Sequence, residues 1–287
     1  MRSLLFLLFL FLNSKLWAAG FDSLLFRPAN GQTKSLSVFS SRMLEPGQVQ
    51  SGLWLYYQSR SLQVLQADSV KFSILDHALM QHLGIALGLH PKWAELSVDV
   101  PFAWSLGFKD PSQPNPREAN QQGIGDMRVA VKTWHLKPLQ NMDFSLLPSI
   151  HLPTGDDDLF IGTKTIVWGI KALSEFQWER WSANLNVGLS TQSAYHYRNI
   201  SRSHEFHYEL ATSYRILPEA LVAMELVGRS KLTDLFARAE DNPIEAHFLT
   251  RFFLTERCQM DLFGSAGLQR GMGVPLMRVG LGLLFGS

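Results

Sequence analysis

Polarity alternates with a period of two through most of the chain after residue 47, in segments of roughly ten residues. Within 181–190, Asn184 and Asn186 share one parity, whereas Leu185 and Val187 share the other. Gly, Pro, Asn, Asp and Ser are frequent in the linkers between such segments. The pattern predicts β-strands with one apolar and one polar face. No helical stripe is long enough for the crossover of a parallel sheet, although 68–81 could hold a short helix. We therefore expect an antiparallel all-β meander.

The lengths of the linkers decide between a membrane barrel and a soluble sandwich, because strands of both alternate in polarity. Tight connections are expected at 90–92, 137–141, 178–180, 217–219 and 255–259. They alternate with longer ones at 105–124, 153–164, 191–203, 231–243 and 270–274. Short turns on one side and long loops on the other are typical of an outer-membrane barrel. This predicts a transmembrane antiparallel up-and-down β-barrel of about 12 strands, formed by residues 48–287.

Aromatic residues gather at both ends of the expected strands. One group lies beside the tight connections: Trp93, Trp134, Trp178, Trp181, Tyr214 and Phe253. Another lies near the long ones: Phe102, Trp104, Tyr195, Tyr197 and Phe236. Two aromatic girdles at the membrane interfaces would produce this distribution, although aromatic residues also favour strand ends and cores in general.

The N-terminus has the layout of a secretory signal peptide. Arg2 precedes an apolar run at 4–12, and Ala18, Ala19 and Gly20 supply the small residues of a cleavage site. We expect residues 1–20 to be removed, so that export leads to the periplasm or the outer membrane. No later stretch approaches the apolar length of a spanning helix. The following segment, 21–47, is either a periplasmic lead-in or a piece inside the lumen, and the sequence leaves both open.

Charge excludes some functions and marks the polar faces of the strands. The formal net charge of +1 offers no basic field for nucleic acid, and the lone Cys258 cannot form an intramolecular disulfide. In a barrel the polar faces point inward, where charges either line a selective aqueous path or brace the wall through salt bridges. Asp143, Arg215, Glu225 and Asp261 have this inward parity as well. The residues that we predict to line the lumen are Glu95, Asp99, Asp126, Arg128, Lys132, Lys171, Glu175, Glu205, His207, Glu209, Arg229, Glu245, His247, Arg251 and Arg278.

Other candidate chemistry is weaker. Ser201, Ser203, His196 and His204 cluster in one long loop and could suggest a lipid hydrolase, but beside arginines they also suit contacts with lipopolysaccharide phosphates. Three carboxylates at 156–158 could bind calcium, yet they lack the alternate spacing of an ion-binding loop and better suit a solvated turn. We expect no catalytic residue, no metal site and no cofactor.

Two motifs carry a resemblance to a known family. They are Gly-Ile-Gly-Asp-Met-Arg at 123–128, followed by Lys132, and Leu-Pro-Thr-Gly-Asp at 152–156. With them the chain, from Leu83 to its end, resembles poorly characterised bacterial outer-membrane barrels related to meta-pathway phenol-degradation transporters and an allied family of unknown function. The resemblance implies an outer-membrane location in a Gram-negative bacterium.

The expected partners are outer-membrane lipid, lipopolysaccharide and the barrel assembly machinery, which reads a terminal aromatic residue; here Phe285 is followed by two further residues. The expected function is a channel or transporter for a small solute, with a hydrophobic or aromatic solute as one option. A lipid-modifying enzyme, a structural barrel without transport and a soluble periplasmic β protein are the alternatives.

Overall fold

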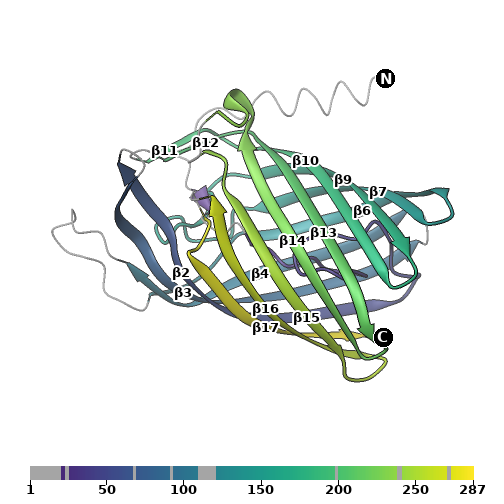
Figure 1. The fold of residues 1–287 in the computed structure, drawn as a ribbon. Helices are drawn as coiled ribbons and strands as arrows, with labels where there is room; N and C mark the ends of the chain where they lie inside the picture. Colours follow the sequence, from purple (N-terminus) through teal and green to yellow (C-terminus); the bar gives the residue numbers. More distant parts are fainter. Residues whose placement is uncertain are drawn as a thin grey trace, which may run out of the picture.

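A closed antiparallel β-barrel forms the structure, which is a computed structural model (Figure 1). It describes residues 21–22, 26–66, 69–90, 93–108, 121–197, 200–237, 241–269 and 273–287. The wall consists of twelve strands: β2 (Val49–Gln66), β3 (Ser69–His90), β4 (Ala94–Phe108), β6 (Met127–Leu139), β7 (Met142–Leu152), β9 (Val167–Trp178), β10 (Trp181–Thr191), β13 (Glu205–Leu217), β14 (Ala220–Lys231), β15 (Ile244–Phe253), β16 (Cys258–Gln269) and β17 (Met277–Gly286). The expected fold class and strand number are confirmed.

Each wall strand pairs with its neighbour in the chain, and β17 closes the ring against β2. The short β5 (Gln121–Ile124) continues the edge of β6 along β4. Outside the wall lie β1 (Phe21–Asp22), β8 (Ile161–Gly162), the hairpin of β11 (Tyr195–Tyr197) and β12 (Ile200–Arg202), and a 3-10 helix at Leu232–Asp234. In the described part of the chain, no helix is long and apolar enough to span a membrane.

The expected parity of the strands is correct, and β10 shows it most simply. Asn184 and Asn186 are 4% and 0% exposed, whereas Leu185 and Leu189 are 51% and 46% exposed. The apolar side chains therefore face outward and the polar ones inward, which is the reverse of a soluble protein. An outer surface of this kind suits hydrocarbon, and the polar backbone groups are satisfied by pairing between strands.

Turns and loops lie at opposite ends of the barrel. The tight turns after β6, β9, β13 and β15 lie at the end where β2 begins and β17 finishes, which we call the short-turn end (Figure 1). At the other, long-loop end, the connections after β7, β10 and β14 are longer. The side chains of Trp93, Trp134, Trp178 and Trp181 at the short-turn end are all at least half exposed. They lie where the predicted girdle requires them.

The short helix proposed for 68–81 is wrong. Residues 69–81 belong to β3, which pairs with β2 on one side and β4 on the other, and residue 68 lies outside the described residues. The adjacent Ile74 and Leu75 are both buried and disturb the alternation, and the register shifts near Leu75. A local break in periodicity therefore imitated a helical pattern, while two neighbouring strands supplied the hydrogen bonds that fix an extended backbone.

Candidate functional site in the barrel lumen

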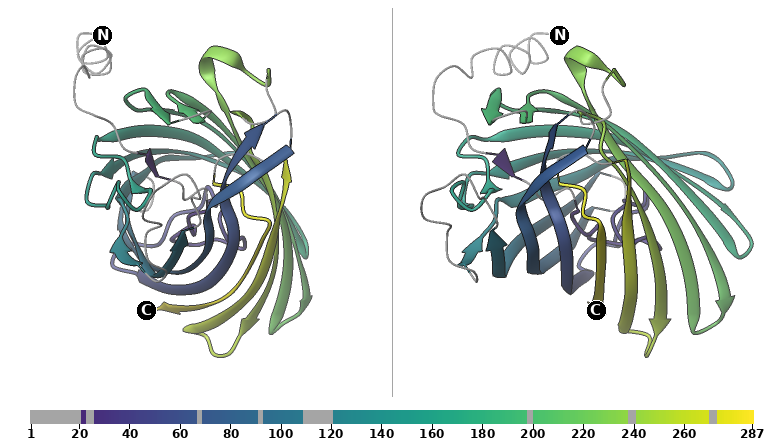
Figure 2. Two further views of the ribbon diagram at one scale, coloured as in Figure 1. Left: turned by 90° about the vertical axis from the view of Figure 1, so that its left-hand side faces the viewer. Right: turned by 60° about the vertical axis from the view of Figure 1, so that its left-hand side comes forward.

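The lumen contains the chain's own N-terminal segment, residues 26–46, which we call the plug (Figure 2). Just before it, β1 pairs with β8 in a loop of the long-loop end. After it, the N–H of Gly47 donates to the carbonyl of Gly88 at the short-turn end. The plug thus runs along the lumen. Its residues Phe26, Leu36 and Phe39 are each at most 2% exposed.

Little regular structure forms in the plug, so its backbone groups need partners from the wall. Wall cations and amides donate to its carbonyls. Lys132 Nζ lies 2.7 Å from the carbonyl oxygen of Arg42, and Arg128 Nη2 lies 2.7 Å from that of Pro28. Arg251 donates to the carbonyls of Thr33 and Ser35. Charged wall residues therefore bind the plug through its backbone carbonyl oxygens, which every residue type has.

Wall carboxylates accept hydrogen bonds from the plug. Glu225 accepts from the N–H of Leu36, and its Oε2 lies 3.0 Å from the Ser37 nitrogen and 2.5 Å from the Ser37 hydroxyl. Glu175 accepts from the Ser40 hydroxyl, and Glu95 lies 2.7 Å from the nitrogen of Leu44. These are charge-assisted bonds in a buried setting, the stronger class of hydrogen bond.

Two basic side chains of the plug add ion pairs. Arg27 pairs with Asp22 at 2.7 Å and Asp99 at 3.2 Å, and Arg42 pairs with Asp143 at 3.3 Å. Burial disfavours the charge of Arg27, but the carboxylates of Asp22 and Asp99 outweigh burial and raise its pKa above the ordinary value.

The plug's third basic residue, Lys34, behaves differently. Burial lowers its pKa, and the carboxylate of Glu175 only partly offsets this effect. The ion pairs described above are made by Arg27 and Arg42.

Charged residues of the wall also pair with each other. Arg251 lies 2.6 and 2.8 Å from the two oxygens of Asp261, and Lys132 lies 3.0 Å from Glu95. Lys171 and Glu209 also form an ion pair. Lys132 and Arg251 therefore pair with acidic residues of the wall and also bind the plug.

The predicted lumen residues lie on the inner face of wall strands, except Asp126, which lies between β5 and β6. Lys171 and His207 are half-buried, and the following are buried: Glu95, Asp99, Asp126, Arg128, Lys132, Glu175, Glu205, Glu209, Arg229, Glu245, His247, Arg251 and Arg278. Several of them bind the plug, including Glu95, Arg128 and Lys132. A role in contacting a solute remains a prediction for each.

Asp126 has a local structural role instead. Its Oδ1 accepts from the nitrogen of Gly155 at 2.9 Å, and its Oδ2 accepts from the nitrogen and hydroxyl of Thr163 at 2.9 and 2.6 Å. A Cβ at Gly155 would lie 2.5 Å from the carbonyl oxygen of Ile161, so only glycine fits there. The two motifs that carry the family resemblance thus meet in one clasp at the long-loop end.

The acidic run at 156–158 closes a turn. Asp156 accepts from the nitrogens of Asp158 and Leu159, and Asp157 pairs with Lys164 at 2.5 Å. Within the described residues, no group of three or more His, Cys, Asp or Glu side chains could hold a metal ion.

The sequence analysis missed an inner network of β2, β3 and β4. The Tyr56 hydroxyl lies 3.2 Å from Nε2 of His82, whose Nδ1 lies 2.9 Å from Asp99. Tyr56 and His82 are at most 1% exposed. Tyr56 and Gln58 share a parity on β2, and this signal could have revealed the inward position of Tyr56.

A cavity of about 110 Å³ adjoins the plug. Its lining includes Phe39 of the plug and, on the wall, Arg128, His151, Lys171 and His207. It is large enough for several water molecules. The wall therefore encloses more space than its own side chains and the plug fill.

Comparisons with known proteins agree with this architecture. The model of a family described as "Putative MetA-pathway of phenol degradation" matches residues 64–235. The match begins earlier than the resemblance noted in the sequence and does not extend to the C-terminus. No curated protein matches the chain.

Solved structures share the fold. An outer-membrane channel from Pseudomonas putida F1 matches with a TM-score of 0.67 and 15% sequence identity. The match covers 86% of this chain and 98% of the channel. The NanC porin has a TM-score of 0.56 and 11% identity, with 82% and 98% covered. The KdgM porin matches with a TM-score of 0.51 and 9% sequence identity, over 82% of this chain and 98% of the porin.

Proposed function

Because the chain belongs to the family of the putative MetA-pathway of phenol degradation, we propose that it is an outer-membrane channel or transporter for a small solute, closed here by its own plug. The short-turn end then faces the periplasm and the long-loop end the exterior. The barrel fold shared with outer-membrane channels and porins supports this proposal.

The observation that carries the proposal is that the wall closes without the plug. All wall strands pair with two wall neighbours, whereas the plug is held by side-chain hydrogen bonds and ion pairs. Displacing it would break no strand pairing. The charged groups that now bind it would become hydrated and would line an aqueous path.

A test should alter the plug and leave every lumen charge in place. Ser37→Ala with Ser40→Ala removes two hydroxyl donors to Glu225 and Glu175. We expect this variant to conduct more often than the wild type in a planar bilayer. Ser182→Ala is the matched control, because that hydroxyl bonds to Asn184 of the wall.

Equal conductance of the variant and the wild type would contradict the role of the plug as the closing element. A lack of ion current and solute uptake in all forms would reject transport and favour a structural barrel.

A further inference from the structure

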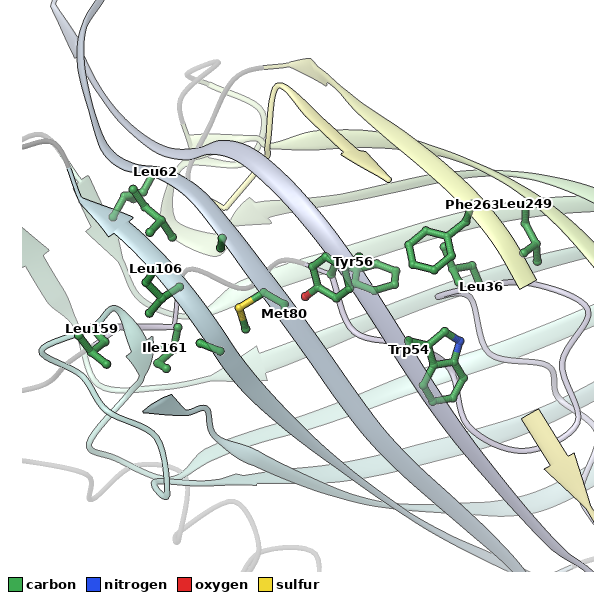
Figure 3. Close-up of a cluster of buried hydrophobic side chains, with 14 of the residues drawn as sticks. Leu36, Trp54, Tyr56, Leu62, Met80, Leu106, Leu159, Ile161, Leu249 and Phe263 are labelled. Atoms are coloured by element: carbon green, nitrogen blue, oxygen red, sulfur yellow. The ribbon is translucent and has the colours of Figure 1, made fainter. Parts of the chain in front are cut away.

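The side chain of Phe26 occupies a pocket of aromatic rings on the wall. It stacks on Phe263, with centroids 5.7 Å apart and planes at 27°, and meets Tyr56 edge-on at 5.1 Å and 85°. The rings of His247 and His82 lie 5.5 and 6.0 Å away. Figure 3 shows Tyr56 and Phe263 within the buried cluster that follows the inner wall. Phe26 itself is 2% exposed.

Arg278 covers the same ring with the face of its guanidinium. Its Cζ lies 4.5 Å from the centroid of Phe26 and 5.2 Å from that of Tyr56. Nε and Nη2 both donate to Gln58, at 3.3 and 3.0 Å, and Nη1 donates to Glu245 and Ser265. The edge of the guanidinium is therefore engaged by the wall. What it offers to the pocket is a cationic face, which attracts the π face of a ring.

A polar atom without a partner lies at the pocket. His247 is 3% exposed, and its Nδ1 has no hydrogen-bond partner within the described structure. Buried nitrogens of this kind are normally satisfied. A bound molecule that carries a hydroxyl group could satisfy it, whereas the hydrocarbon ring of Phe26 cannot.

These observations assign a ligand class to the pocket. We infer that Tyr56, Phe263, His82, His247 and Arg278 form a binding site for a single-ring aromatic molecule, which Phe26 occupies while the plug is docked. The inference rests on the proposed function, because a solute would reach the pocket only through the lumen. Stacked, edge-on and cation–π contacts all favour an aromatic ring over a saturated ring of equal size.

The test measures binding and needs no transport. Phe26→Ala removes the ring and leaves the wall residues in place. We expect this variant in detergent to bind phenol about tenfold more tightly than cyclohexanol, a difference of about 1.4 kcal/mol. Isothermal titration measures both affinities. Leu36→Ala truncates an apolar side chain of the same buried cluster and should show no ring preference.

The double variant Phe26→Ala with Phe263→Leu identifies the source of the preference. We expect the preference for phenol to shrink, because the stacking partner is lost while the cavity remains. Equal binding of phenol and cyclohexanol by Phe26→Ala would overturn the inference, as would a preference that Phe263→Leu leaves unchanged.

A second measurement applies if Phe26→Ala does not fold. A Ser41→Cys probe, placed in the plug in a Cys258→Ser background, is buried at 0% exposure in the docked state. Phenol should displace Phe26 and accelerate maleimide labelling of the probe, and cyclohexanol should not. No acceleration by phenol would overturn the inference. Ring-selective binding without solute flux in any form would reject the channel alone, and flux without ring-selective binding would reject the aromatic site alone.

Discussion

Glu225 offers the sharpest test of how the plug is held. Glu225 is 4% exposed, and in the described part of the chain its carboxylate accepts three hydrogen bonds, all from the plug at Leu36 and Ser37. Glu225→Gln keeps the shape of the side chain but removes its charge and turns one acceptor into a donor. The new NH2 group would face groups that are themselves donors.

The expected effect of Glu225→Gln on plug docking follows from the loss of at least one charge-assisted hydrogen bond. Such a bond contributes about 1.5–3 kcal/mol, so the undocked fraction of the plug should rise about ten- to a hundredfold. The Ser41→Cys probe in the Cys258→Ser background reports this fraction as a rate of maleimide labelling. Heat-modifiable migration on a gel should be retained, because the strand pairing of the wall is untouched.

Glu209→Gln is the matched control for this experiment. Glu209 also lies in the lumen, but it pairs with Lys171 and Asn186 of the wall. The Glu209→Gln variant should therefore be labelled at a rate near that of the wild type. An unchanged rate in Glu225→Gln, or an equal rise in Glu209→Gln, would refute the reasoning.

Three further predictions concern the wall and the clasp. Leu185→Arg places a charge on the lipid face and should cost about 2–4 kcal/mol of folding free energy in lipid. Asn184→Arg faces the lumen, so it should spare the wall but displace Phe39, whose carbonyl oxygen lies 3.4 Å from the Asn184 amide. Equal folding defects in the two variants would show that the parity is wrong. Lys132→Gln leaves Glu95 buried without its cation and should cost about 3–5 kcal/mol in urea unfolding, and adding Glu95→Gln should recover part of this loss; no recovery would mean that the ion pair is not the cause. Asp126→Asn replaces one of the two oxygens that accept from Gly155 and Thr163 by an NH2 donor, so it should loosen the clasp and speed tryptic cleavage after Lys164. Unchanged cleavage would argue against the clasp.

The wall was predictable because lipid imposes one simple rule on every strand. Side chains on one face must be apolar, so the alternation at residues such as Asn184 and Leu185 marked the strands and their two faces. The alternating short and long linkers then indicated an up-and-down barrel with its apolar face outward. The turns were predictable too, since each closes a hairpin between chain neighbours. Local departures from alternation were not, as the error at 68–81 shows. There, pairing on both sides of β3 decided the conformation.

Which charges brace the wall and which hold the plug is decided by tertiary structure alone. Arg128 and Lys132 share a face of one strand, and their spacing showed that they point inward. Their partners on the plug are the carbonyls of Pro28 and Arg42, which any residue could supply. No pattern of side chains encodes such contacts. They exist because an irregular segment inside a closed lumen must satisfy its backbone groups, and only the surrounding wall can do so.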